Sequence, residues 1–475
     1  QGQDLSTFVN LVDNQINIQG IVNAVGKNGA FNNGHAVFIS PNGMVVGSSG
    51  VLNVGSLTVL TPDSNSYEKY KSDLKRPSLI ADYKSKLGEG NATVKIDGKV
   101  LARNFVDINA ANLQVSPDAQ IMAGVKDATK ILSNTQAEAL FNQLVNADNM
   151  SANSFANDNG SIIIRTYGEN GGTDIAGTMK NFGTGSTEIT NLGSKGINVS
   201  GKSLNGNGDT LLVNKNGEVN VSGTVANKGG KLLVDNTGSG VLIASTGLLS
   251  NQGGELIVTN TGNDGVSIAN GGLVKNSTHS ANIINSGKNG INVKGHVNAN
   301  GINITNKNSN VILGDYTGSN NLNSTGNVNI KINDGNLLNY GTKETLIKAS
   351  KNLDIDVQNG MVGQEVGPCD GGVCTGIGPN GRDLTKSINV NVDGNIKTIS
   401  TKGTNKSLVN MASLNNDMRV DQIKADGRVI LLADSSIKGS KAYDIINAST
   451  NSQNPNVEGT GISMISSGNV LYGRD

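Results

Sequence analysis

Large aromatic side chains are scarce in this sequence, and tryptophan is absent altogether. Phe, Tyr and Trp together make up 3% of the 475 residues, whereas glycine alone contributes 63. Compact cores depend on large side chains, so an ordinary globular domain fits this composition poorly. Val, Ile and Leu nevertheless recur at short intervals along the chain, which a disordered segment would not show. The chain therefore has to bury many small aliphatic side chains in a regular way.

An excess of charge is also missing, and so are long apolar runs. The 38 basic residues balance the 38 acidic ones. A neutral chain has no long-range attraction for a phosphate backbone, which argues against nucleic-acid binding. No apolar run approaches the roughly 18 residues that a membrane helix needs. The chain begins with Gln1 rather than Met, so we expect a processed or excised product.

Cysteine occurs only twice, at Cys369 and Cys374 in the stretch "GPCDGGVCTG". A structural zinc site would need two more thiolate or imidazole ligands nearby, and a redox pair would more usually read Cys-x-x-Cys. We therefore expect a local disulfide between the two, with free thiols as the alternative. Such a bridge indicates an oxidising compartment and hence export.

From about residue 155 onward the sequence repeats itself. Each repeat contains an apolar strand, an Asn/Gly turn, a second strand, another turn and a short third strand. The second strands of successive repeats recur every 20 to 25 residues, at the positions marked by Val219, Val241, Val266, Ile291 and Val311. A period of this length with β-type alternation is typical of a solenoid.

Three short strands per repeat predict an all-β fold, a right-handed parallel β-helix. Leucine-rich repeats would need a fixed Leu/Asn frame, which is missing. In a β-helix the coils bury a column of Val, Ile and Leu, and their Asn side chains can form hydrogen-bonded ladders. Glycine supplies the positive φ angles of the corners. Accordingly, we expect Pro41-Asn42-Gly43 and Gly47–Gly50 to be corners, and the sequence from 51 to 60 to be a pair of strands.

Three segments interrupt the repeats. Residues 63–87 and 127–150 carry apolar side chains at helical spacing and predict two helical insertions. In the second insertion Thr135 and Glu138 are spaced as a capping box. The third segment, residues 361–386, holds both cysteines and is expected to be a loop.

Catalysis has no clear support in the sequence. Polysaccharide-degrading β-helix enzymes use clustered carboxylates, whereas Asp and Glu are scattered here and no Asp-Asp pair occurs. The three histidines, His35, His279 and His296, lie far apart in polar contexts, so we expect exposed corner residues. We predict no catalytic residue, no metal site and no cofactor.

The segment 16–62, which contains "FISPNGMVVG", resembles the secretion domain of filamentous haemagglutinin-like adhesins, and most closely that of leukotoxin-like filamentous adhesins. The family has an Asn-Pro-Asn-Gly phrase between an aliphatic strand and a small-residue strand, and Ser40-Pro41-Asn42-Gly43 stands in its place. Residues 420–439 are similar to the filamentous repeat of the same family. The family's upstream Asn-Pro-Asn-Leu phrase is missing, so we expect a fragment, or a neighbour that covers the first coil.

The resemblance implies two-partner secretion through an outer-membrane transporter, and a secreted or surface-exposed product of a bacterium with an outer membrane. It divides the chain into a secretion-domain-like β-helix over 1–126, the helical insertion 127–150 and a repetitive shaft over 151–475. It also implies Ser40, Pro41, Asn42 and Gly43 as a secretion motif.

We therefore expect an adhesive or structural exoprotein that attaches to a host or neighbouring-cell surface. One alternative is a self-assembling filament or surface-layer subunit, in which chains stack end to end as a homopolymer. A carbohydrate-active β-helix enzyme is the least favoured alternative, because no carboxylate cluster supports it.

Overall fold

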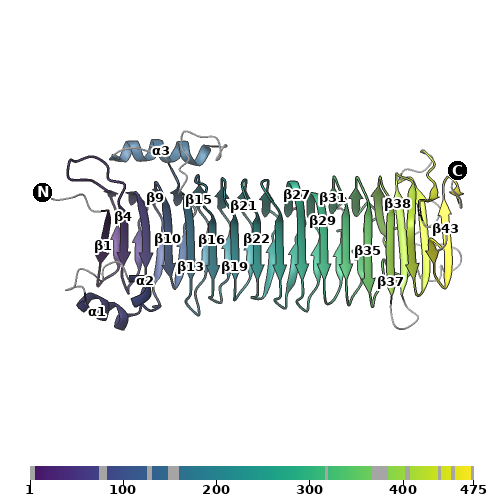
Figure 1. Cartoon of the computed structure of the whole chain (residues 1–475), viewed down its shortest axis with the longest axis horizontal. Coiled ribbons are helices and arrows are strands. Elements are labelled where there is room, and N and C mark those ends of the chain that lie inside the picture. Colours follow the sequence, from purple (N-terminus) through teal and green to yellow (C-terminus); the bar gives the residue numbers. More distant parts are fainter. Residues whose placement is uncertain are drawn as a thin grey trace. The chain divides into compact units, whose positions relative to one another are not determined.

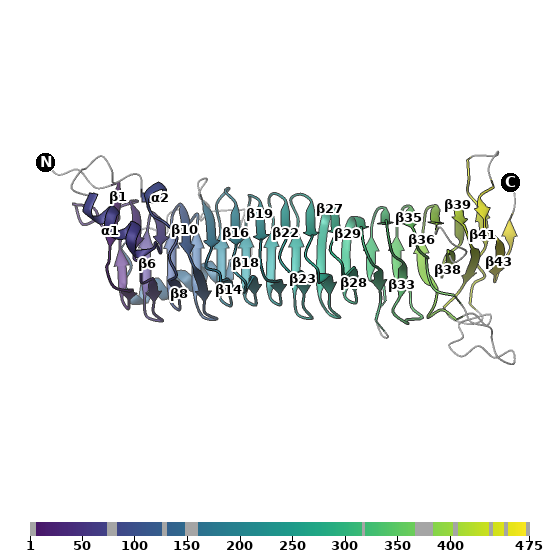
Figure 2. The ribbon, with the colours of Figure 1, turned by 90° about the horizontal axis from the view of Figure 1, so that it is seen from below.

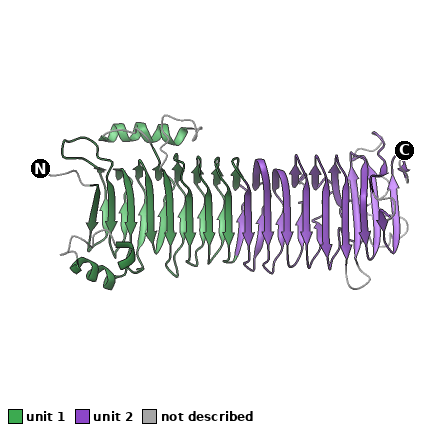
Figure 3. Cartoon of the chain, in the orientation of Figure 1, with its two compact units in different colours: residues 1–239, 248–254 green, residues 240–247, 255–475 purple. Residues whose placement is uncertain are grey.

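The architecture comes from a computed structural model, which describes residues 6–73, 83–125, 131–147, 160–315, 319–365, 383–401, 407–436, 440–450 and 455–471. The chain forms two compact units, of which unit 1 comprises residues 1–239 and 248–254 and unit 2 comprises residues 240–247 and 255–475 (Figure 3). Each unit is a parallel β-helix whose short strands stack on three faces, as the repeats predict (Figure 1).

Unit 1 stacks its strands in chain order on each face. The first face consists of β1 (Thr7–Leu11), β4 (His35–Ile39), β7 (Ser56–Leu60), β10 (Phe105–Ala110), β13 (Ser161–Thr166), β16 (Thr187–Asn191), β19 (Thr210–Asn214) and β22 (Leu232–Asn236). The second face consists of β2 (Ile16–Ile18), β5 (Met44–Val46), β8 (Thr93–Ile96), β11 (Asn112–Val115), β14 (Thr173–Ile175), β17 (Ile197–Val199) and β20 (Val219–Val221). The third face consists of β3 (Ile21–Asn23), β6 (Val51–Val54), β9 (Lys99–Ala102), β12 (Gln120–Ala123), β15 (Thr178–Asn181), β18 (Lys202–Asn205), β21 (Thr224–Asn227) and β24 (Leu248–Asn251).

Unit 2 has the same arrangement. Its first face contains β25 (Leu256–Asn260), β32 (Val328–Ile332), β35 (Leu353–Gln358), β37 (Ile396–Thr401), β39 (Met418–Ala425) and β42 (Val457–Glu458). The start of β39 also pairs with β41 (Ile445–Asn447), which pairs in turn with β44 (Val470–Leu471). Its second face contains β23 (Gly240–Ile243), β26 (Gly265–Ile268), β28 (Ile291–Val293), β30 (Val311–Leu313) and β33 (Leu337–Asn339). Its third face contains β31 (Leu322–Ser324), β34 (Ile347–Ala349), β36 (Ile388–Val392), β38 (Leu408–Leu414), β40 (Arg428–Asp434) and β43 (Gly461–Ser466). Two longer strands, β27 (Leu273–Asn285) and β29 (His296–Asn306), each bend around a corner and serve the third and the first face.

Aliphatic side chains fill the interior of each coil. In unit 1, Ile189 pairs in register with Leu212, which pairs with Val234, and all three are at most 1% exposed. In unit 2, the four markers of the sequence repeat that fall in this unit occupy one position of four successive coils: Val241, Val266, Ile291 and Val311. Each buried aliphatic side chain contributes about 1.5–3 kcal/mol, so the column compensates for the scarcity of aromatics.

Asparagine ladders line the corners of the coils. In unit 1, Asn191 donates its side-chain N–H to the Oδ1 atom of Asn214 at 2.8 Å, and Asn214 donates to Asn236 at 2.8 Å. In unit 2, Asn260 donates to Asn285 at 2.8 Å, and Asn285 continues to the next coil. The remaining amide hydrogen of each side chain binds a turn carbonyl, such as Gly217 O for Asn214 at 2.9 Å. The ladders therefore satisfy the buried amides, as the repeats predict.

Helical insertions cover two faces of unit 1 (Figures 1 and 2). Helices α1 (Ser64–Asp73) and α2 (Tyr83–Lys86) pack on the first face, where Tyr67 and Tyr70 are buried against apolar side chains of β4 and β7. Helix α3 (Asn134–Asn146) packs on the third face, where Phe141 and Leu144 belong to one cluster with side chains of β6, β9 and β12. The prediction of two helical insertions is confirmed. None of the helices in the described ranges combines the length and hydropathy that a membrane crossing demands.

The capping box of α3 differs from the prediction. Ser133, not Thr135, is the N-cap residue, and its side chain accepts from the backbone N–H of Gln136 while Gln136 binds back to Ser133. Ser133 is in an extended conformation (φ −86°, ψ 169°), as an N-cap residue must be, whereas Thr135 is already inside the helix. The prediction that Thr135 and Glu138 form the capping box is therefore wrong, and the box begins two residues earlier. Ser133 and Gln136 have the same Ser/Thr-x-x-Glu/Gln spacing as Thr135 and Glu138, so the spacing alone does not distinguish the two pairs.

Candidate functional site

The four residues of the predicted secretion motif form one corner of unit 1, between β4 and β5. The N–H of Gly43 donates to the carbonyl of Ser40 at 3.3 Å, which closes the turn. Gly43 has a φ of +83°, and a Cβ atom at this position would lie 2.3 Å from the carbonyl oxygen of Thr93. The corner therefore needs glycine both for its backbone conformation and for the close approach of the next coil.

Two polar side chains of this corner hold the corner of the neighbouring coil. The Ser40 hydroxyl donates to the carbonyl of Asn14 at 2.7 Å and accepts from the N–H of Asn42 at 3.1 Å. The Asn42 amide donates to the carbonyl of Asp13 at 2.6 Å. Ser40 is only 1% exposed, whereas Asn42 lies at the surface. These contacts tie one coil to the next, and they offer no reactive group.

The corner at Asp13 also anchors α1. The Asp13 carboxylate accepts from the hydroxyl of Tyr67 at 2.7 Å and from the ammonium of Lys71 at 2.8 Å. The hydrogen bond from Lys71, followed by the one from Tyr67, lowers the pKa of the Asp13 carboxyl below its usual range. The same pairing raises the pKa of Lys71. One corner therefore connects the secretion-motif turn on one side with the helical insertion on the other.

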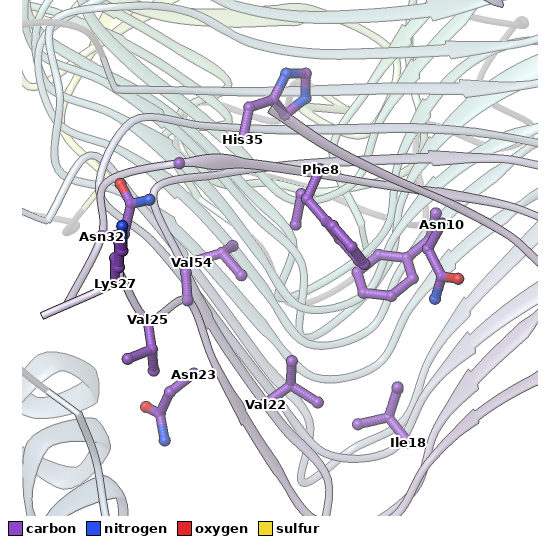
Figure 4. Close-up of a pocket in the computed structure, with 14 residues that line it drawn as sticks. Phe8, Asn10, Ile18, Val22, Asn23, Val25, Lys27, Asn32, His35 and Val54 are labelled. Carbon is purple, nitrogen blue, oxygen red and sulfur yellow. The ribbon is translucent and has the colours of Figure 1, made fainter. Parts of the chain in front are cut away.

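An apolar groove lies beside β1, β3 and the loop that follows β3 (Figure 4). Its volume is about 560 Å³, and Phe8 and Val25, which line it, are 55% and 48% exposed. The other lining residues are Asn10, Ile18, Val22, Asn23, Ala24, Lys27, Asn32, Gly34, His35, Ala36, Phe38 and Val54. Phe8, Val22 and Val25 are thus exposed side by side in one groove. Single exposed apolar residues are ordinary on a protein surface, whereas a cluster of them is typical of an interaction surface.

His35 lines this groove, and its surroundings differ from the expected exposed corner. It begins β4, its Nε2 atom lies 2.7 Å from the hydroxyl of Thr58, and its ring packs edge-on to Phe105 at 5.1 Å. Burial lowers the pKa of His35. Its polar sequence neighbours gave no sign of this packing, because Thr58 and Phe105 come from later coils.

Ionisable side chains beside α2 are paired with each other. Asp107 accepts from the Lys84 ammonium and from the Asn109 amide, and Arg165 pairs with Glu89. Across the part of the chain that the structure describes, no three His, Cys, Asp or Glu side chains come together in a way that could hold a metal ion.

A buried lysine that the sequence did not single out holds the end of α3. The Lys180 ammonium donates to the carbonyls of Leu144, Val145 and Ala147 at 2.8, 2.8 and 3.0 Å, and the residue is 3% exposed. The last carbonyls of a helix have no partner within the helix, and a cation there also meets the negative end of the helix dipole. Lys180 therefore fixes α3 on the third face of unit 1.

Cys369 and Cys374 lie outside the described residues, so their disulfide stays a prediction. Comparisons with family models, curated proteins and solved structures found no match to this chain.

Proposed function

We propose that this chain is a secreted or surface-exposed filamentous adhesin, exported by two-partner secretion from a bacterium with an outer membrane. The observation that carries the proposal is the corner Ser40–Gly43, whose sequence resembles the secretion motif and whose side chains join two coils. Its partners are an outer-membrane transporter and a host or neighbouring-cell surface. Attachment is the function, and no catalytic residue takes part.

The contacts of this corner suit a chain that folds as it emerges from a pore. A strand of 3 to 5 residues, such as β2, β4 or β5, has no stability alone, and a repeat is stable only when it stacks on another. The bonds from Ser40 and Asn42 reach back 26 and 29 residues and so join two coils at once. A joined pair of coils is a template on which each later coil can stack. Folding outside the cell would then draw the chain outward.

The experiment is an export assay on a full-length precursor, expressed together with its transporter. Asn42→Ala removes the 2.6 Å bond to the Asp13 carbonyl and leaves the strands intact, so we expect the precursor to accumulate in the periplasm. The matched control is Asn216→Ala, which changes another exposed Asn-Gly corner of unit 1 and should leave secretion unchanged. Normal secretion of the Asn42 variant would refute the role of this corner.

A second candidate function is self-assembly into a filament or surface layer, for which the apolar groove at Phe8 is the specific observation. Its occupant would be a second copy of this chain, because half-exposed Phe8 and Val25 favour burial against another apolar surface. Phe8→Ser with Val25→Ser should then abolish any concentration-dependent rise in particle mass seen by light scattering. A wild-type chain that stays monomeric at every concentration would exclude this candidate.

A further inference from the structure

A polar groove crosses the second face of unit 1, on the outer side of β11, β14, β17 and β20. Its volume is about 390 Å³. The residues that line it are Asn112, Gln114, Gly172, Thr173, Asp174, Lys195, Ile197, Asn198, Glu218 and Asn220. None of them is aromatic, and most carry hydrogen-bonding side chains. This surface belongs neither to the secretion-motif corner nor to the groove at Phe8.

The floor of this polar groove is a row of four polar side chains. Gln114 pairs in register with Asp174, Asp174 with Asn198, and Asn198 with Asn220. In β14, β17 and β20 the first and last residues are buried, and only the central residue of each strand reaches the surface. Because paired strands lie about 4.8 Å apart, the row presents one hydrogen-bonding group per step of this length.

The row offers both donors and acceptors. Asn198 donates its amide N–H to Oδ1 of Asp174 at 2.9 Å, which orients both side chains. The Oδ1 atom of Asn220 is buried and has no hydrogen-bond partner among the described residues. A buried acceptor without a partner costs free energy, and rotation of the Asn220 side-chain amide toward the groove would let a ligand hydroxyl supply the missing hydrogen bond.

Charge and backbone pairing restrict the class of ligand. Among the lining residues, Asp174 and Glu218 are acidic and Lys195 is basic, and Lys95, which continues the row beside Gln114, pairs with Asp97 at 3.1 Å. The small acidic excess disfavours an anionic ligand, and the described residues contain no group of three His, Cys, Asp or Glu side chains that could hold a metal ion. The backbones of β11, β14 and β17 are paired on both sides, so an extended peptide could not add a strand here.

A ligand for this surface must therefore be uncharged, extended and rich in groups that both donate and accept. Hydroxyl groups do both, and a linear sugar chain presents them at intervals close to the strand spacing. We propose that the row Gln114–Asp174–Asn198–Asn220 binds a neutral linear oligosaccharide. The inference rests on the proposed function, since it names the ligand class of an attachment surface.

The corresponding row of unit 2 shows that polarity is not general on this face. There Leu242 pairs with Ser267, Ser267 with Asn292, Asn292 with Ile312, and Ile312 with Leu338. The row thus begins and ends with apolar side chains, and only Ser267 and Asn292 between them are polar. The sugar-binding surface that we propose is confined to unit 1.

The test is isothermal titration calorimetry on the purified full chain with cellotetraose, laminaritetraose and maltotetraose as probes. We expect at least one of the three to bind. Asp174→Ala with Asn198→Ala should weaken that binding at least tenfold. Asn220→Ala should weaken the binding of the oligosaccharide as well. The Oδ1 atom of Asn220 makes no hydrogen bond in the free protein, so losing it should not disturb folding. The control is Asn303→Ala with Asn329→Ala, which removes a hydrogen-bonded pair from the outer side of β29 and β32 in unit 2 and should leave binding unchanged.

Three results would overturn the inference: no binding of any probe, equal binding by the double variant with a native melting curve, or binding only of a heparin-derived tetrasaccharide that salt abolishes. The assay uses purified protein and no transporter. A negative titration would therefore count against sugar binding and not against export. A negative export assay would count against the secretion motif and not against sugar binding.

Discussion

Replacing Lys180 with methionine should release α3 from the third face of unit 1. The change keeps the apolar stem of the side chain and removes three hydrogen bonds, of 2.8, 2.8 and 3.0 Å, to the carbonyls at the end of the helix. A hydrogen bond from a charged group contributes about 1.5–3 kcal/mol, and a partly buried cation at a helix C-terminus contributes up to about 2 kcal/mol. Part of this loss of stability is offset, because the variant no longer has to desolvate an ammonium group. We expect a net loss of about 3 kcal/mol.

The loss should be local, because the coils under α3 are held by their own strand pairing and Asn ladders. Hydrogen exchange of the α3 amides should therefore accelerate by about two orders of magnitude, since each 1.4 kcal/mol is worth a factor of ten. The global melting temperature should change little. Lys202→Met is the control, because Lys202 is exposed on the adjoining strand β18. Unchanged exchange in α3 of the Lys180 variant would refute the role given to its ammonium.

Three further predictions use other parts of the chain. Asn214→Leu removes the hydrogen bonds that Asn214 accepts from Asn191 and donates to Asn236 and to the carbonyl of Gly217, so chemical denaturation should show a loss of about 2–4 kcal/mol, and no loss would contradict the ladder. Tyr67→Phe should destabilise the docking of α1 at neutral pH. The folded-state pKa of Asp13 is lowered, so the ion-paired carboxylate stabilises the docked helix above about pH 3.9. Hydrogen exchange of the α1 amides should show that the difference between variant and wild type shrinks as acid protonates Asp13. A thiol reagent should label Cys369 and Cys374 only after reduction, and equal labelling before reduction would show free thiols.

Most of the fold could be predicted because its signals are local and periodic. Val241, Val266 and Ile291 recur at the coil period, and they do occupy one position in successive coils. The turn at Pro41-Asn42-Gly43 follows from residues adjacent in sequence. Each of these features depends on a short stretch of chain that is repeated many times.

The site could be predicted only in part, because its contacts join distant residues. The motif Ser40–Gly43 was visible as a turn, but its bonds to the corner at Asp13 depend on how two coils stack. The attachment of Tyr67 to Asp13 spans 54 residues, and that of Lys180 to Leu144 spans 36. No local pattern encodes either pair. The outward row of the polar groove likewise appears only when the register of four coils is known.

Adherence of whole bacteria would show whether this chain is an adhesin. A non-adherent strain with an outer membrane would receive the full-length precursor, its transporter, or both, with display at the cell surface checked by antibody. Bacteria bound to an epithelial monolayer would then be counted. We expect adherence to rise at least tenfold, and only in the strain that carries both genes. Equal adherence of all strains, with the chain verified at the surface, would contradict it.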